Sequence, residues 1–246
     1  MDDRKKLGVV GGMGSVAAAY FFNRLVELTP AKTDQQYIET FVHNNSSVPD
    51  RTDGILYGGE SPLPELRRSV SILNEMGADY IVMACMTSHY FIEDLQRESR
   101  AIIIDGIKET AHSLRQDYGN IKRAGILAST GAIKLGLFQK ALADLNMEGI
   151  VLNDEEQFLY FTEPIYHQEW GIKTGCVDGK SKERLFQGVE ALSRAGAQVV
   201  IAGCSELPLI FRGESLSVPV VDSIDVLLEK AIKLCLGLDQ SLRLRV

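Results

Sequence analysis

Short apolar runs alternate with longer stretches in which apolar residues recur every three or four positions. The runs have the length of buried strands, and the stretches have the period of one helix face. Strands are predicted at Leu7–Val10, Tyr37–Val42, Tyr80–Met83, Ile102–Ile104, Gly125–Ala128, Val199–Ala202 and Val218–Val221. Helices are predicted near residues 15–28, 62–76, 88–98, 106–117, 134–145, 180–195 and 223–236. This alternation predicts parallel sheets with helices on both faces.

The two halves of the chain repeat one pattern. The segment Gly77–Cys85 resembles Gly196–Cys204, and the apolar helix face that precedes each segment also matches. Two further pairs of segments, beginning with those around Gly8 and Ile104, recur in the same order. Four collinear matches indicate a duplicated unit. We therefore predict an α/β protein of two similar, pseudo-symmetric lobes, each a parallel sheet flanked by helices, with the active site in the cleft between them.

Length and charge narrow the range of possible protein classes and partners. The 246 residues are 45% hydrophobic and 24% charged, which suits a globular protein with a sizeable core. The lobes are predicted at residues 1–118 and 119–246, and the C-terminal helix is expected to cross onto the first lobe. The net charge of −7 and the lack of a basic tract argue against a nucleic-acid partner. No apolar run approaches the ~20 residues of a membrane span, and the N-terminus does not resemble a signal peptide, so we expect a cytoplasmic protein without a membrane partner.

Two of the four cysteines occupy equivalent places in the repeat. Cys85 and Cys204 each follow the last apolar residue of a predicted strand, where ligands bind in parallel α/β folds. The duplication therefore predicts two thiols that face one another across the cleft. If each cysteine is considered by itself, the alternative to a catalytic role is that its side chain packs in the core as a small apolar residue. Cys176 and Cys235 have no such counterpart and are expected to be non-catalytic, and the cysteine and histidine spacings indicate no metal site.

Two acid–base groups on opposite faces of one carbon suit racemisation. One thiolate removes a proton and the opposite thiol returns one, and the thiol pKa is close enough to neutrality for both forms to be used. The two sites are then coupled through the shared proton inventory. Groups that hold the substrate carboxylate would stabilise the developing carbanion.

Six short segments spread over nearly the whole chain carry a family resemblance. They are Gly11–Gly14, Val48–Thr52, Ala84–His89, Gly171–Gly175, Gly203–Leu207 and Pro219–Ser223. In combination they resemble the pyridoxal-phosphate-independent aspartate/glutamate racemase superfamily, most closely its aspartate racemase branch. The resemblance implies a homodimer of two-lobed chains that acts on a small amino-acid substrate without a cofactor.

The resemblance also implies roles for individual residues. Cys85 and Cys204 correspond to the catalytic thiols, and Arg51 and Lys173 to the cations that hold the side-chain carboxylate. Thr87 and Ser205 correspond to hydroxyl groups on the α-carboxylate, and Glu206 is a candidate for orienting a thiol or the substrate ammonium group. The predicted substrate-binding residues are Gly12, Met13, Arg51, Met86, Thr87, Ser88, Lys173, Ser205 and Glu206.

Met86 departs from the family pattern, which has Asn at this place. An Asn side chain donates to the α-carboxylate, whereas Met has no donor. The loss of one such donor costs roughly 2–3 kcal/mol of transition-state stabilisation. Weaker activity, a different substrate and replacement by a backbone amide are all open outcomes.

Several other interpretations stay open at this point. The favoured function is racemisation of L- and D-aspartate; the alternatives are a same-fold isomerase or decarboxylase of small diacids and a non-catalytic amino-acid-binding module. Gly12–Ala17 fits a dinucleotide fingerprint, but the next predicted strand runs into His43 rather than an acidic residue. His89 is expected either to tune Cys85 or to cap the next helix. Asp105 and Asp222 are expected to cap helices.

Overall fold

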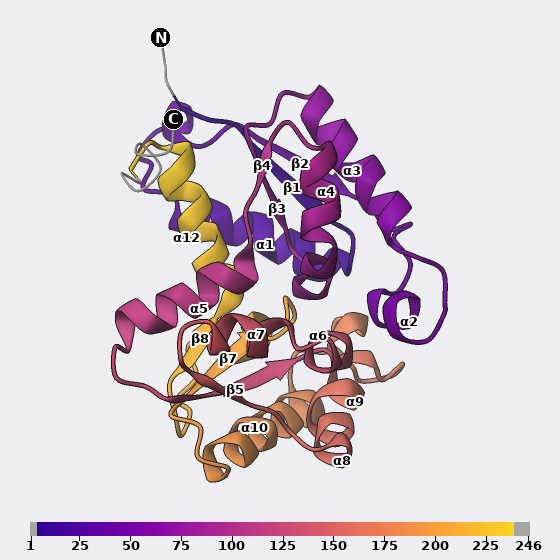
Figure 1. The fold of residues 1–246 in the computed structure, drawn as a ribbon, viewed down its shortest axis with the longest axis vertical. Helices are drawn as coiled ribbons and strands as arrows, with labels where there is room; N and C mark the ends of the chain where they lie inside the picture. Colours follow the sequence, from indigo (N-terminus) through magenta and orange to yellow (C-terminus); the bar gives the residue numbers. More distant parts are fainter. Residues whose placement is uncertain (1–3, 239–246) are drawn as a thin grey trace.

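The computed structural model describes residues 4–238, which form two parallel sheets of four strands each (Figure 1). The first contains β1 (Leu7–Gly11), β2 (Thr40–Asn44), β3 (Tyr80–Met83) and β4 (Ile102–Ile103), in the order β2-β1-β3-β4. The second contains β5 (Arg123–Ala128), β6 (Glu148–Ile150), β7 (Val199–Gly203) and β8 (Val220–Asp222), in the order β6-β5-β7-β8. The identical strand order confirms the predicted α/β fold of two similar lobes.

Helices connect the strands of each lobe. The α-helices of the first half are α1 (Ser15–Leu28), α2 (Arg51–Leu56), α3 (Leu63–Glu75), α4 (Ile92–Glu98) and α5 (Gly106–Asp117). Those of the second half are α6 (Thr130–Lys134), α7 (Leu137–Ala143), α8 (Asp154–Gln157), α9 (Glu163–Tyr166), α10 (Gly179–Arg194), α11 (Pro208–Phe211) and α12 (Ser223–Cys235). Short 3₁₀ segments are η1 (Asp34–Gln36), η2 (Met86–Phe91) and η4 (Ile172–Thr174), and η3 (Phe158–Thr162) is a π-helical turn.

The two lobes share helices at their junction. In Figure 1, α5 and α12 lie side by side between the two sheets. Helix α12 also packs on α1 and β3, whereas α5 packs on α7. Asp105 caps α5 by accepting from the Ile107 and Lys108 amides, and Asp222 caps α12 by accepting from the Ile224 amide. Both capping predictions are confirmed.

A single apolar core continues across this junction. It joins Val9 of the first sheet and Ile126 of the second to Leu227 on α12. Burial of such residues supplies the main stabilisation of the two-lobed arrangement. The lobe limits at residues 118 and 119 stay a prediction, and the outer ends of the predicted lobes, residues 1–3 and 239–246, lie outside the described residues.

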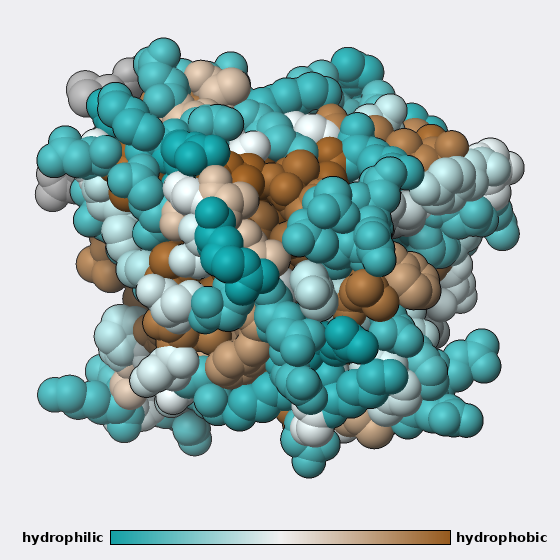
Figure 2. Space-filling view, turned by 90° about the horizontal axis from the view of Figure 1, so that it is seen from below, coloured by the Kyte–Doolittle hydropathy of each residue, from teal (hydrophilic) through white to brown (hydrophobic). Residues whose placement is uncertain are grey.

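The face of the molecule seen in Figure 2 is mainly hydrophilic. The face seen in Figure 2 shows apolar residues in patches between polar ones. Within residues 4–238, no helix is both long enough and apolar enough to span a membrane.

Candidate active site

The loop between β1 and α1 depends on glycine. Gly12 has φ +89°, and a Cβ atom there would lie 2.3 Å from the carbonyl of Asn45. Both conditions favour a residue without a side chain. Gly14 is less confined, since a Cβ atom there would lie 3.3 Å from Lys173 Nζ and 3.6 Å from Glu206 Oε1. The first-lobe loop is therefore in direct contact with two predicted site residues of the second lobe.

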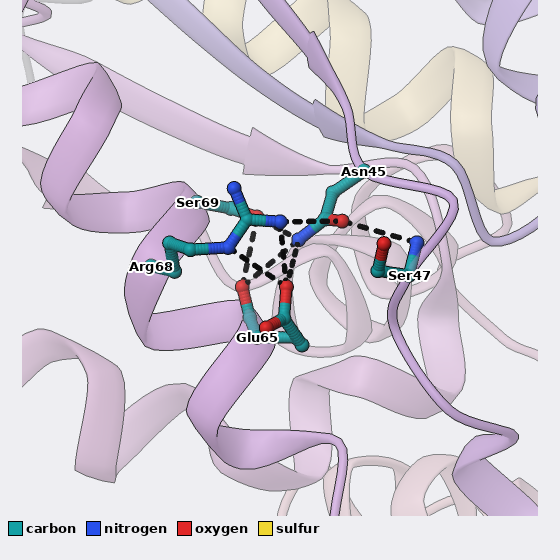
Figure 3. Close-up of polar contacts among 5 residues, drawn as sticks. All are labelled: Asn45, Ser47, Glu65, Arg68 and Ser69. Carbon is teal, nitrogen blue, oxygen red and sulfur yellow. Dashed lines mark hydrogen bonds and ion pairs between the residues drawn. The ribbon is translucent and has the colours of Figure 1, made fainter.

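Asn45 anchors the chain between this loop and Arg51 (Figure 3). Its side-chain amide donates to Glu65 Oε2 and Ser69 Oγ, each over 3.0 Å. Its Oδ1 accepts from Arg68 over 3.0 Å and from the Ser47 amide over 3.1 Å. The buried Asn45 side chain thus has donors and acceptors matched on all sides, which fixes the loop on α3.

Arg51 is held almost completely inside the protein. It begins α2, which Asp50 caps by accepting from the Asp53 amide, and only 8% of Arg51 is exposed. Its guanidinium donates to the carbonyl oxygens of Pro49 (3.0 Å) and Met13 (3.2 Å). It also lies within hydrogen-bonding reach of Cys85. Burial opposes the charge, but the negative charges that Cys85 and Asp50 can carry favour it, so the pKa of Arg51 is raised.

Cys85 lies two residues beyond the end of β3 and occupies the N-cap position of η2. Its carbonyl accepts from the Ser88 amide (3.2 Å), the Ser88 hydroxyl (2.5 Å) and His89 Nδ1 (3.2 Å). These bonds hold the backbone that carries the thiol. His89 contacts the Cys85 carbonyl, and Phe91 occupies the N-cap position of α4, so the expectation that His89 caps that helix is wrong. The expectation that His89 tunes the Cys85 thiol stays a prediction.

Cys204 occupies the equivalent place after β7 and has an acidic neighbour. Its thiol donates to Glu206 Oε2 over 3.0 Å, and the Ser205 hydroxyl donates to the same oxygen over 3.1 Å. The other oxygen of Glu206 pairs with Lys173 Nζ at 3.0 Å. Desolvation and the Glu206 charge raise the pKa of Cys204 well above its ordinary value.

These groups form one electrostatic cluster that spans both lobes. Negative charge on Cys85 also raises the pKa of Cys204. Burial raises the pKa of Tyr166, and charge on either thiol or on Glu206 raises it further. Burial opposes the charge of Lys173, but Glu206 more than offsets this and raises its pKa. The turns after β3 and β7, together with α2 and η4, therefore supply the two thiols, the two cations and the carboxylate of this cluster.

Other predicted site residues lie around or outside this cluster. Met13 is buried and contributes its carbonyl to Arg51. The Thr87 hydroxyl is hydrogen-bonded to the Ser129 hydroxyl over 2.7 Å, which joins the two lobes. Met86 is 1% exposed and belongs to the shared core, and its terminal methyl lies beside Gly106. The structure does not bring the Met86 side chain into the charged cluster, and substrate binding by it stays a prediction.

Three members of the site were not among the predicted binding residues. Ser129 and Gly14 could have been found, because the internal repeat aligns Ser129 with Gly12 and because Gly14 lies in a quoted family segment. Tyr166 is the third member. Its ring lies 5.3 Å from Lys173 Nζ, and no sequence pattern places it there.

The structure also bears on cofactor sites. Strand β2 ends at Asn44, whose amide donates to Ser15 Oγ over 3.1 Å, so the position of a ribose-binding carboxylate is taken by an amide. Across the described part of the chain, no three His, Cys, Asp or Glu side chains are grouped as metal ligands.

Comparison with known proteins identifies the family. A model of the Asp/Glu/Hydantoin racemase family matches residues 10–231. The chain belongs to this family. Among solved structures, the aspartate racemase of Picrophilus torridus has a TM-score of 0.79 at 23% identity, and the match covers 94% of each chain. The family match agrees with the expected superfamily, and the structural match shows that the two proteins share a fold.

Curated relatives within the family carry more than one specificity. The glutamate racemase of Corynebacterium kroppenstedtii is 30% identical over 174 residues, which are 65% of this chain and 57% of that protein. The broad specificity amino-acid racemase RacX of Bacillus subtilis strain 168 is 20% identical over 226 residues, covering 88% of this chain and 92% of RacX. Family membership alone therefore does not select one amino acid.

Proposed function

We propose that the protein interconverts the enantiomers of an acidic amino acid, L- and D-aspartate above all, without a cofactor. The observation that carries this proposal is the position of Cys85 and Cys204 beyond the ends of β3 and β7, the equivalent strands of two similar lobes. Two cations, the buried Arg51 and the partly exposed Lys173, accompany them in a chain of net charge −7. Such cations suit a substrate that has a second carboxylate.

The two thiols have unequal surroundings, which suggests a starting state for the reaction. Arg51 lies beside Cys85, whereas the Glu206 carboxylate accepts from the Cys204 thiol and helps to raise the pKa of that group. Cys85 would then remove the α-proton of one enantiomer while Cys204 delivers a proton to the opposite face. The reverse reaction needs the exchanged protonation state, in which Glu206 stands next to a thiolate.

Hydroxyl groups and cations would hold the carbanion that forms between these steps. Arg51 and Lys173 are proposed to bind the distal carboxylate, and Thr87 and Ser205 to bind the α-carboxylate. The Lys173 ammonium group would then be shared between Glu206 and the substrate. Because the Met86 side chain packs in the core, a donor at that position has to come from the backbone.

A chiral assay without added cofactor tests this function. Wild-type protein should convert L-aspartate to D-aspartate, and glutamate, asparagine and alanine measured alongside would define the substrate range. Cys85→Ser and Cys204→Ser should each abolish turnover, whereas Cys176→Ser, in a loop outside the cluster, should leave it unchanged. Near-normal turnover in either of the first two variants, or a need for pyridoxal phosphate, would overturn the proposal.

We further propose that the protein works as a cytoplasmic homodimer. All four cysteines are free, which suits a reducing compartment. Val16, Phe22 and Val26 on α1 and Val42 on the edge strand β2 are exposed, and a contact between two copies of the chain would bury residues of this kind. Light scattering that gives the mass of a single chain would contradict the dimer.

A further inference from the structure

Two buried hydroxyl groups meet where the two lobes touch. Thr87 belongs to η2 and lies two residues after Cys85, and Ser129 directly follows β5 of the other lobe. Their oxygen atoms are 2.7 Å apart, and only 6% of Thr87 and 4% of Ser129 is exposed. The proposed reaction assigns Thr87 to the α-carboxylate and gives Ser129 no role.

The partners of the two hydroxyl groups decide which of them donates when an anion is bound. Ser129 Oγ accepts from the Ala132 amide over 3.1 Å. Within residues 4–238, the Ser129 hydroxyl has no other partner than this amide and Thr87, and the Thr87 hydroxyl has no other partner than Ser129. A carboxylate only accepts. If one binds at Thr87, the Thr87 proton turns to it, and Ser129 then donates to Thr87 Oγ1.

The result is a directed chain of hydrogen bonds. It runs from the Ala132 amide through the hydroxyl groups of Ser129 and Thr87 to the carboxylate. Each donor in such a chain polarises the next one, and the bond to the charged group is the strongest. Without the Ser129 hydroxyl, the Thr87 oxygen would receive no proton from the protein, and its own proton would be a weaker and less directed donor.

The other side chains proposed or expected at the α-carboxylate are less available. The Ser205 hydroxyl donates to Glu206 Oε2 over 3.1 Å and has to leave that partner to reach a carboxylate. The Met86 side chain has no donor and packs in the shared core. The Thr87 proton is therefore the one whose direction matters most for this group.

The backbone of this turn does not explain the hydroxyl of Ser129 by itself. The internal repeat aligns Ser129 with Gly12, so the equivalent turn of the first lobe forms without a side chain. Ser129 caps α6, but the cap uses only the acceptor side of its oxygen. The donor side is left for Thr87.

We propose that Ser129 is a positioning residue, which donates to Thr87 Oγ1 and so directs the Thr87 proton to a carboxylate bound beside Cys85. The identity of that group as the α-carboxylate of the substrate rests on the proposed function, whereas the action of Ser129 on Thr87 does not. A residue of the second lobe thus supports a binding group of the first, so the carboxylate is held best when the two lobes are in contact.

Succinate is the probe for this inference, because it has two carboxylates but no stereocentre and its binding needs no turnover. Its Kd is measured by calorimetry at neutral pH for the wild type, Ser129→Ala, Thr87→Val and the double variant. Ser129→Ala should raise the Kd about five- to tenfold, as the weakening of a hydrogen bond to an anion would. In the Thr87→Val background the same change should alter the Kd less than about twofold, since Ser129 acts through Thr87.

Two further variants separate the hydroxyl from its surroundings. Ser129→Thr keeps both the hydroxyl and the cap and should bind succinate as the wild type does. Thr130→Val removes the neighbouring hydroxyl, which is bonded to Thr162 over 3.3 Å, and should leave the Kd unchanged. The kcat/KM for L-aspartate should follow the same pattern through all these variants.

Loss of the α6 cap alone would weaken binding equally with and without Thr87. Equal losses in the two backgrounds would therefore overturn the inference, as would the absence of saturable binding at millimolar succinate. If succinate binding shows the expected pattern but L-aspartate is not racemised, the proposed function fails while the role of Ser129 stands.

Discussion

The thiol of Cys204 donates to Glu206 over 3.0 Å, and Glu206 also pairs with Lys173 at 3.0 Å. Glu206→Gln keeps the shape of the side chain but removes its charge, so the pKa of Cys204 should fall. A fall of one unit gives about ten times more thiolate at a pH below the pKa. Alkylation of Cys204 by iodoacetamide, followed by mass spectrometry against pH, should therefore be about tenfold faster in the variant.

Glu214→Gln is the matched control for that measurement. It removes a carboxylate that pairs with Lys182 at 2.7 Å on the surface, and the alkylation profile of Cys204 should stay that of the wild type. Equal profiles for all three proteins would show that Glu206 does not control the thiol.

Gly12 allows a second test at the scale of one residue. Gly12 has a left-handed backbone conformation, and Gly12→Ala places a Cβ atom 2.3 Å from the Asn45 carbonyl. Gly58 also has a positive φ, +74°, but the Cβ atom of Gly58→Ala has no other atom within 4 Å. Gly58→Ala should cost about 1–2 kcal/mol of unfolding free energy from the backbone alone. Gly12→Ala should cost more and should also weaken racemisation. Denaturant unfolding of the two variants gives the comparison, and equal losses would contradict the close approach.

At the scale of the element, α12 carries a titratable cap. Burial raises the pKa of Asp222 to about 7, from an ordinary 3.8, and the charge of Asp225 adds to this. Between about pH 4 and pH 7 the folded protein then holds a proton that the unfolded chain has released. The contribution of Asp222 to stability therefore falls as the pH rises through this window.

Asp222→Asn should remove that dependence and keep the cap, because Asn also accepts from the helix amide. The unfolding free energy of the variant minus that of the wild type should therefore increase as the pH rises from 4 to 7. Asp105→Asn, the equivalent cap of α5, controls for the loss of a capping carboxylate. A difference that does not change with pH would show that Asp222 is not protonated in the folded protein.

Elements with a strong pattern could be predicted from the sequence. Strand β3 has the predicted bounds because its four apolar residues are consecutive. Helix α1 also has its predicted bounds, because its apolar residues recur with the period of one helix face. Strand β6 was missed because it is three residues long and contains Gly149. Residues 154–166 were missed because two short helices and a π-helical turn share no single period. The predicted helix at 134–145 is divided, since Gly136 adopts φ +68° before α7.

At the scale of the whole molecule, duplication made the thiol pair predictable. Equivalent residues of two copies fall at equivalent strand ends, so a match between Cys85 and Cys204 in the sequence implies a match in space. Contacts between unlike parts of the lobes follow no repeat. The Thr87–Ser129 bond across the lobes and the core position of Met86 therefore needed the structure.

The junction of the lobes also depends on the whole chain. Arg24 on α1 makes a bidentate pair with Asp225 on α12, with distances of 2.7 and 2.5 Å. Residues some two hundred positions apart thus fix the helix that both lobes share, and the relative position of the two thiols depends on this packing.

The most direct test of the two-thiol account is α-proton exchange in D₂O. L-aspartate is incubated with the protein. At early times the two enantiomers are separated, and the deuterium content of each is measured by mass spectrometry. If one thiol removes the proton and the other returns one from solvent, the D-aspartate formed first should be fully deuterated while the remaining L-aspartate keeps its hydrogen. D-aspartate that retains the original hydrogen would show that a single group serves both faces, and would contradict the account.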